Sequence, residues 1–205
     1  MKFPVVVLVA FLVSLATANK FTYYVFARTW LPGQCRNRNT HGCAPAVLAN
    51  HKTKLTIHGL WPNGIESCPT QHRSTLTADD ITRAGGAATI SAAMPGASKA
   101  DMAFWTHEWT KHGTCSNMPA AKYFKQMLHL RNHLKTPAIL NSSAGPVTVT
   151  PAFGGNAVLI CSSQGGVQYL TEVRTCHLKN AVNTVSPCPG PAPGNACSLA
   201  NVVIS

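Results

Sequence analysis

Acidic side chains are scarce in this sequence. Its 205 residues include 6 Asp and Glu against 17 Lys and Arg, which gives a formal net charge of +11. Such a basic balance argues against a cationic partner and favours nucleic acid, an acidic polysaccharide or another anionic surface. A charge that serves only solubility is the alternative, and composition alone leaves it open.

Long apolar runs are also missing after the first residues. The longest, Val5 to Leu15, is about a dozen residues, too short for the ~20 that a membrane-spanning helix needs. It follows a basic residue and precedes the small-residue pattern Ala16-Thr-Ala18, so residues 1–18 are expected to be a secretory signal peptide, with the mature chain starting at Asn19. We therefore expect a secreted protein without a membrane span, exported or delivered to a vacuolar or lysosomal-type compartment.

No Cys-x-x-Cys pair occurs, which argues against a structural zinc site. An even number of cysteines after a signal peptide instead predicts four disulfides, although spacing does not fix which cysteines pair. No metal or other cofactor is expected. The only Asn-x-Ser/Thr sequon makes Asn141 the expected glycosylation site, on a loop. The eight cysteines are Cys35, Cys43, Cys68, Cys115, Cys161, Cys176, Cys188 and Cys197.

The chain has no internal repeat or linker, so residues 19–205 are expected to form one domain. Runs of helix and strand without regular βαβ alternation predict an α+β fold. β-branched and aromatic runs predict strands at Phe21–Phe26, Leu55–Ile57, Val147–Thr150, Ala157–Cys161 and Val167–Cys176. Apolar spacing predicts a weak helix within Leu76–Ala97, a helix from Lys99 to His112 and a helix from Ala120 to Leu134, with loops at Leu31–Ala44 and Pro187–Gly194.

The helix ending at His112 is expected to begin at a capping box of Ser98 and Asp101 and to stop at Gly113. Trp105 and Trp109 lie on one side of it and are expected in the core. At 3.6 residues per turn, five other residues share an arc of about 140°. They are Phe104, His107, Glu108, Lys111 and His112.

This polar arc has two other readings. One is a solvated surface with an ordinary Glu108–His112 pair four residues apart. The other is the zinc-protease pattern His-Glu-x-x-His. It fails because Lys111 stands four residues after His107 and cannot coordinate while charged. His112 is five positions from His107, so the two imidazoles do not face one metal.

A third histidine, His58, follows the expected strand Leu55–Ile57 and precedes Gly59 and Pro62, where a loop side chain can point into a cleft. Cleaving RNA through its own 2′-OH needs a base for that proton and an acid for the leaving 5′-oxygen, and imidazoles do both. Lysine and protonated histidine stabilise the negative charge of the phosphorane, and aromatic rings stack single-stranded bases. The chain offers each of these groups.

Two segments resemble the active-site signatures of the T2 ribonuclease family: Ile57-His-Gly-Leu-Trp-Pro62 and Phe104-Trp-Thr-His-Glu-Trp-Thr-Lys-His-Gly-Thr-Cys115. Looser likeness covers the rest of the mature chain, at Tyr23–Trp30, Tyr123-Phe124 and Tyr169–Cys176. The resemblance implies an antiparallel sheet flanked by helices and an endoribonuclease that needs no metal. It further implies the disulfides Cys35–Cys43, Cys68–Cys115, Cys161–Cys197 and Cys176–Cys188.

The same resemblance implies catalytic roles. His112 would be the general base on the 2′-OH, and His58 the general acid for the leaving group. His107 would bind phosphate, while Glu108 and Lys111 would polarise or stabilise the phosphorane. Single-stranded RNA would be converted to 2′,3′-cyclic phosphates and then slowly to 3′-phosphates, and DNA would be left intact. We also expect a monomer.

The resemblance assigns the bases to aromatic residues. Trp61 would stack the base on the 5′ side of the scissile bond, and Phe104 would help to hold the base on the 3′ side. Asn63 stands where some members have Asp, and it replaces an acceptor-only carboxylate by an amide that also donates. Thr29 stands where many members have Gln. Both departures bear on base preference, and neither touches the acid–base residues.

Two other hypotheses remain at this point. A catalytically silent relative would bind RNA or glycan through its basic surface, although the intact His58 and His112 with Lys111 and Glu108 argue against it. Alternatively, the activity is kept and serves a specific role, because the family includes self-incompatibility ribonucleases of flowers and members in phosphate scavenging and defence. The sequence does not separate these roles.

Overall fold

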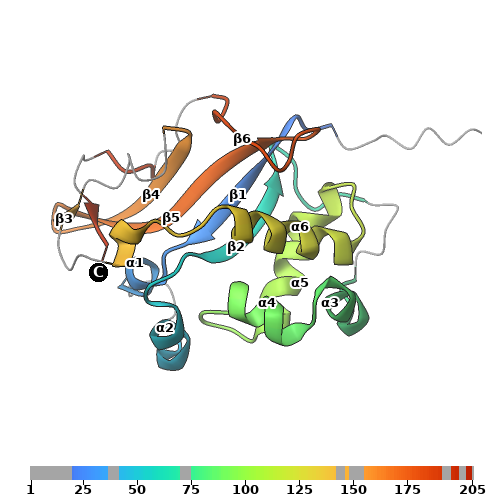
Figure 1. Cartoon of the computed structure of the whole chain (residues 1–205), viewed down its shortest axis with the longest axis horizontal. Helices are drawn as coiled ribbons and strands as arrows, with labels where there is room; N and C mark the ends of the chain where they lie inside the picture. Colours follow the sequence, from blue (N-terminus) through green and yellow to red (C-terminus); the bar gives the residue numbers. More distant parts are fainter. Residues whose placement is uncertain are drawn as a thin grey trace, which may run out of the picture.

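A mostly antiparallel sheet carries the fold, with β5 at its centre (Figure 1). The computed structural model describes residues 20–36, 42–69, 75–141, 146–147, 155–190, 195–198 and 202–204. Within these ranges β7 is the one strand that runs parallel to its neighbour β5. The strands are β1 (Tyr23–Thr29), β2 (Thr56–Pro62), β3 (Pro146–Val147), β4 (Ala157–Gln164), β5 (Val167–Leu178), β6 (Val185–Ser186) and β7 (Val202–Val203).

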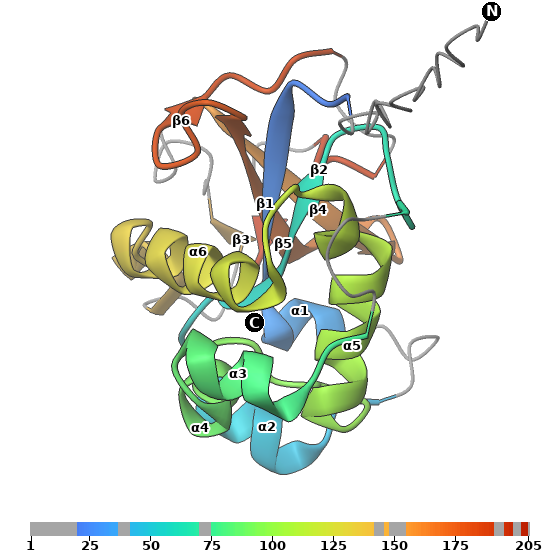
Figure 2. The same ribbon diagram turned by 90° about the vertical axis from the view of Figure 1, so that its right-hand side faces the viewer.

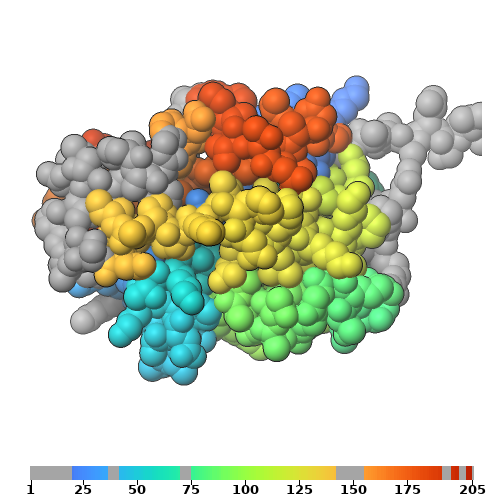
Figure 3. Space-filling model, viewed as in Figure 1, coloured from blue at the N-terminus to red at the C-terminus, as the bar shows by residue number. Residues whose placement is uncertain are grey.

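Most of the helices lie to one side of this sheet (Figure 2). Helix α6 packs against β2 and also against α3 and α4, and it lies between those two helices and the β6 segment on the face in Figure 3. The expected α+β fold, an antiparallel sheet flanked by helices, is confirmed. The helices are α1 (Leu31–Arg36), α2 (Pro45–His51), α3 (Ala78–Ala84), α4 (Ala87–Ala93), α5 (Asp101–Lys111) and α6 (Ala120–His133), with 3-10 turns at Gly113–Cys115 and Ala138–Asn141.

The main core lies between the sheet and helices α3 to α6. Trp105 and Trp109 are buried in it, as expected, and Trp105 Nε1 donates to the carbonyl of Met94 at 2.8 Å. Tyr123, Met127 and Leu130 of α6 are buried as well, whereas Leu134, just after the helix, is only partly covered. A smaller cluster around Trp30, Leu170 and Val173 fills the other end of the sheet.

Strand β2 continues through His58, so the prediction that the strand ends before this histidine is wrong. Gly59 and Pro62 suggested an interruption, but β2 is an edge strand, where glycine and proline are tolerated. The register of β1 with β2 shifts between Ala27 and Arg28. His58 is thus placed by a rigid strand rather than by a loop.

The start of α5 also differs from the prediction. Its N-cap is Ala100, without a side-chain cap, and the Asp101 carboxylate accepts from the backbone N–H of Gly96 at 2.6 Å. The predicted capping box with Ser98 therefore does not form. Gly113 does follow the helix, but for a packing reason, because a Cβ there would lie 2.2 Å from the Trp109 ring.

Two segments contain more helix than predicted, one expected as a weak helix with a loop and the other as a loop. The segment Leu76–Ala97 forms α3 and α4, separated by Gly85 and Gly86 at φ values of 132° and 91°. A capping box does start α3, between Thr77 and Asp80. The segment Leu31–Ala44 begins with α1, which packs so closely on β5 that a Cβ at Gly33 would lie 1.7 Å from the Leu170 carbonyl oxygen.

Four disulfides close the fold, and all four pairings implied by the resemblance are confirmed. Cys68–Cys115 ties the segment after β2 to the segment after α5, and the Cys161–Cys197 link encloses Cys176–Cys188. The fourth, Cys35–Cys43, ties α1 to the residues just before α2.

Several predictions fall on residues outside the described ranges. They are the signal peptide of residues 1–18, most of the strand predicted at 147–150, and the end of the loop predicted at 187–194. Asn141 is described and exposed, at the end of the turn Ala138–Asn141. None of the described helices has the length and apolar character needed to cross a bilayer.

Candidate active site

The two histidine-bearing segments meet where α5 lies beside the edge strand β2. Trp61 Nε1 donates to Oε2 of Glu108 at 2.9 Å, so the strand and the helix are joined by a side-chain hydrogen bond. Gly59 permits this approach, because a Cβ at that position would lie 2.3 Å from both of those atoms. Glu108 is only 1% exposed, and the reading of a solvated Glu108–His112 surface pair is therefore wrong.

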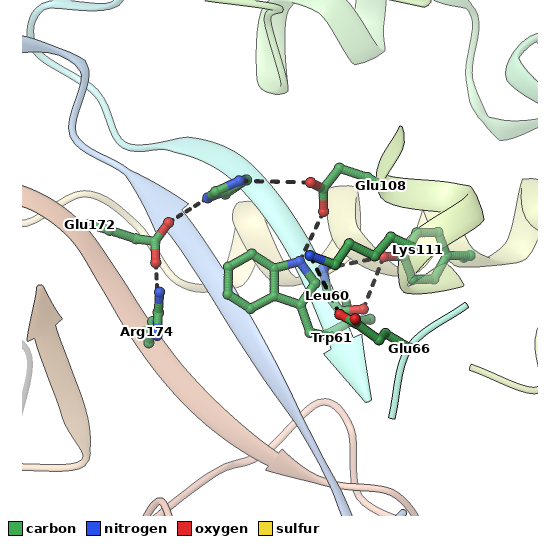
Figure 4. A network of polar contacts seen from close by, with 9 residues as sticks. Leu60, Trp61, Glu66, Glu108, Lys111, Glu172 and Arg174 are labelled. Carbon is green, nitrogen blue, oxygen red and sulfur yellow. Dashed lines mark hydrogen bonds and ion pairs between the residues drawn. The ribbon is translucent and has the colours of Figure 1, made fainter. Parts of the chain in front are cut away.

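His58 lies between two carboxylates (Figure 4). Its Nδ1 donates to Oε2 of Glu172 at 2.5 Å, and its Nε2 lies 3.7 Å from Oε1 of Glu108. The two carboxylate side chains are 8% and 2% exposed, whereas 37% of the His58 side chain is exposed. The Nδ1 atom of the imidazole is thus held by Glu172, while part of the ring remains exposed to solvent.

Burial alone would lower the pKa of His58, but the hydrogen bond to Glu172 and the charges of Glu172 and Glu108 raise it on balance. Burial raises the pKa of Glu108, with a partial offset from His58. The pKa of Glu172 is lowered despite its burial, because His58 and Arg174 both stabilise the carboxylate. The protonated form of His58 is therefore favoured by its surroundings.

His112 has the opposite environment. It is the C-cap of α5, and its ring lies 5.2 Å from that of Trp61. Burial, followed by the positive charges of Lys111, His58 and His107, lowers the pKa of His112 to about 4. Its Nδ1 is buried without a hydrogen-bond partner among the described residues. His112 is therefore neutral at neutral pH and is able to accept a proton.

The remaining predicted residues surround these two imidazoles. Lys111 Nζ lies 3.4 Å from Oε2 of Glu66, and His107 is exposed. The Phe104 ring lies 5.9 Å from that of His58. Asn63 is exposed just beyond β2, and its backbone N–H donates to the carbonyl of Tyr23 at 3.0 Å.

Two cavities border the site, one lined in part by His58 and the other in part by Trp61. One of about 220 Å³ includes Thr29, His58, Phe104 and His107 in its lining. Another, of about 430 Å³, has a lining that includes Tyr23, Trp61, Asn156, Arg174 and Cys188. The His58 and Trp61 rings, 5.0 Å apart, connect the two hollows.

Two acid–base groups, one favoured as protonated and one as neutral, thus lie against the same Trp61 ring in a basic molecule. The sequence model described as the Ribonuclease T2 family matches residues 21–188, which include both histidine segments. The chain belongs to the ribonuclease T2 family. It is an endoribonuclease of the T2 type.

Named relatives support this membership of the T2 ribonucleases. The chain is 30% identical to ribonuclease MC of Momordica charantia over 82% of its own length and 94% of the relative. It is 29% identical to ribonuclease S-2 of Antirrhinum hispanicum over 86% and 80% of the two chains. Relatives named as extracellular and as intracellular ribonucleases of Solanum lycopersicum also match.

Solved structures give the same fold. A variant of ribonuclease MC1 in complex with 5′-UMP superposes with a TM-score of 0.70 at 25% identity, covering 90% of this chain and 98% of that one. The Nicotiana alata SF11-RNase, at 20% identity, shows the same fold with a TM-score of 0.70 and covers 90% and 99% of the two chains.

Sequence reasoning missed three charged residues at the site of this T2 ribonuclease. Glu172 and Arg174 come from β5, and Glu66 contacts Lys111 from the loop after β2. A signal existed for the first two. They stand two positions apart in a predicted strand, and therefore on one face, in a chain with few acidic residues.

Proposed function

We propose that this T2 ribonuclease cleaves single-stranded RNA by transesterification through its own 2′-OH, with His112 as general base and His58 as general acid. The observation that carries the proposal is the opposite environment of the two imidazoles around Trp61. When surroundings push the pKa values of two titratable groups apart, the acid and base roles follow. The lower pKa of His112 suits the base, and the raised pKa of His58 suits the acid.

In the proposed reaction, neutral His112 takes the proton of the 2′-OH, and the 2′-oxygen attacks the adjacent phosphorus. Protonated His58 gives its Nε2 proton to the 5′-oxygen as the P–O5′ bond breaks. The products are a 2′,3′-cyclic phosphate and a free 5′-OH. Slow hydrolysis of the cyclic phosphate, with the two roles exchanged, then gives a 3′-phosphate.

The phosphorane formed during attack carries extra negative charge. Lys111 is the side chain of α5 that supplies a positive charge beside His112, and exposed His107 adds a phosphate contact when protonated. Glu108, whose pKa is raised by burial, is placed to polarise the phosphoryl group near His58 Nε2.

The two cavities suit the bases on either side of the scissile bond. Trp61 borders the larger cavity, and Phe104 borders the smaller one. Both rings are partly exposed, as stacking on splayed single-stranded bases requires. Asn63 and Thr29 are the positions at which we expect base preference to differ from that of other family members.

The first test incubates the correctly oxidised protein with a defined single-stranded RNA oligonucleotide in excess EDTA and identifies the fragments by mass. We expect fragments that end in 2′,3′-cyclic phosphate, because neither proton transfer needs a metal ion. The absence of cleavage between pH 4 and 8 would instead support a basic protein that binds RNA or glycan without cutting it.

The expected pH dependence of cleavage follows from the directions in which the pKa values of His112 and His58 are shifted. The base must be neutral, so kcat/KM should rise as the pH passes upward through about 4, the pKa of His112. The acid must be protonated, so kcat/KM should fall only above the pKa of His58, which lies above the usual 6.5. Initial rates on a dinucleotide from pH 3 to 9 should thus give a bell with a broad mildly acidic to neutral plateau. A steady rise beyond pH 8 would contradict the assignment.

We propose that residues 1–18 direct the protein into the secretory route and that residues 19–205 act as one monomeric domain. Exposure of Asn141 at the end of a turn is compatible with glycosylation of that residue.

A further inference from the structure

Glu172 is held in place beside His58 by the sheet around it. It lies in the middle of β5, opposite Thr29 of β1 on one side and Ile160 of β4 on the other. A residue hydrogen-bonded into the sheet on both sides has little backbone freedom. Its side chain is only 8% exposed, so substrate and solvent have almost no access to it.

Both oxygens of this carboxylate have a partner. Oε2 accepts from His58 Nδ1 at 2.5 Å, and Oε1 accepts from Arg174 Nε at 2.6 Å. Arg174 is itself held over the Trp61 ring, with its guanidinium carbon 5.2 Å from the ring centroid. The carboxylate therefore cannot turn away from His58 without breaking the contact with Arg174 (Figure 4).

This arrangement determines which imidazole nitrogen can give up a proton. When Nδ1 donates to Glu172, the transferable proton is on Nε2, on the opposite edge of the ring. The charged and titratable groups facing His58 are Glu172 and Arg174 from β5 and Glu108 from α5, with His107 and His112 further away. Only Glu172 has a direct hydrogen bond to the ring among the described residues.

We propose that Glu172, held by Arg174, is the positioning residue of the general acid: it fixes the tautomer and the orientation of His58 without touching the RNA. This inference rests on the proposed role of His58. The rival explanation is a purely structural ion pair that stabilises β5 against β2. The two explanations predict different losses of kcat for a Glu172 variant on substrates with different leaving groups.

The experiment compares two substrates. One is a uridylyl dinucleotide, whose alkoxide leaving group needs a proton. The other is uridine 3′-(4-nitrophenyl phosphate), whose nitrophenolate departs without one. For Glu172→Ala, we expect kcat to fall about 100-fold on the dinucleotide and less than about 10-fold on the nitrophenyl ester, since general acid catalysis contributes about 10²- to 10⁴-fold. The alkaline limb of the dinucleotide profile should also move to lower pH.

Equal losses on both substrates, with an unmoved alkaline limb, would show that Glu172 is only structural. Asp79→Asn is the matched control, because Asp79 forms an exposed ion pair with Arg83 on α3, away from the site. Its kinetics should equal those of the wild type. His58→Ala on the same substrates keeps the two proposals separate: no leaving-group difference there would refute the role of His58 itself, whereas a difference for His58→Ala but not for Glu172→Ala would refute only the role of Glu172.

A measurement on the unmodified protein covers the case in which Glu172→Ala does not fold. Nitrogen-15 NMR of the neutral His58 ring should show the proton on Nδ1, as the contact with Glu172 requires. A neutral ring protonated on Nε2 would overturn the proposal, since that Nδ1 could not donate to the carboxylate.

Discussion

His58→Ala and His112→Ala should each lower kcat/KM for a dinucleotide by about 10²- to 10⁴-fold while the protein remains folded, because each removes one of the two proton transfers. The two variants should also differ. Without His112, the acidic limb of the pH profile should disappear, and without His58 the alkaline limb should disappear. Steady-state kinetics across the pH range, together with thermal unfolding of each variant, provide the measurement.

The double variant His58→Ala/His112→Ala should lose less than the product of the two single losses, because both groups act in one transition state. His133→Ala is a suitable control. His133 is exposed near the end of α6, where its ring contacts that of His129, and its removal should leave the kinetics unchanged. Near-normal turnover in either single variant would rule out the acid–base assignment.

A 2′-deoxy substitution at the nucleotide on the 5′ side of the scissile bond should abolish cleavage at that bond. The 2′-oxygen is the nucleophile in the proposed reaction, and no other group on the substrate can form the cyclic product. An oligodeoxynucleotide that contains one ribonucleotide should accordingly be cut only on the 3′ side of that ribonucleotide. Mass analysis of the fragments locates the cut.

The matched substrate places the deoxy sugar on the 3′ side of the bond instead. It should be cleaved at nearly the normal rate, because only the leaving 5′-oxygen of that nucleotide takes part in the reaction. Cleavage of all-DNA single strands at a comparable rate would show that the attacking group is water or a protein side chain.

Helix α5 was predictable from sequence because the pattern that indicates it is local. Helical periodicity alone places Phe104, Glu108 and Lys111 on one side and Trp105 and Trp109 on the other. The exact start of α5 was not predictable, since Asp101 serves the Gly96 backbone rather than a capping box. A short polar side chain near the start of a helix can make several different contacts, and the sequence does not show which of them forms.

Elsewhere the sequence was less informative, because the contacts depend on strands that are far apart in the chain and pair only in the fold. Glu172 meets His58 only because β5 and β2 both pair with β1, and strand order is not visible in a single chain. The same reason explains why β2 was predicted too short. Its continuation through Gly59 depends on β1 as a partner and on the approach of Glu108, which a glycine accommodates and any side chain would block.

The site draws on β2, α5 and β5, and Glu172 is 114 residues from His58. A nascent chain that has emerged only as far as His112 already carries both proposed catalytic imidazoles, yet it lacks the strand that brings a carboxylate to the first of them. Strand β5 is also the central strand of the sheet, so among the described strands β1 and β2 can pair only with each other until it is made. A ribonuclease is synthesised on a machine built of RNA. In this chain the order of synthesis would delay completion of the proposed cleaving site until β5 has been made.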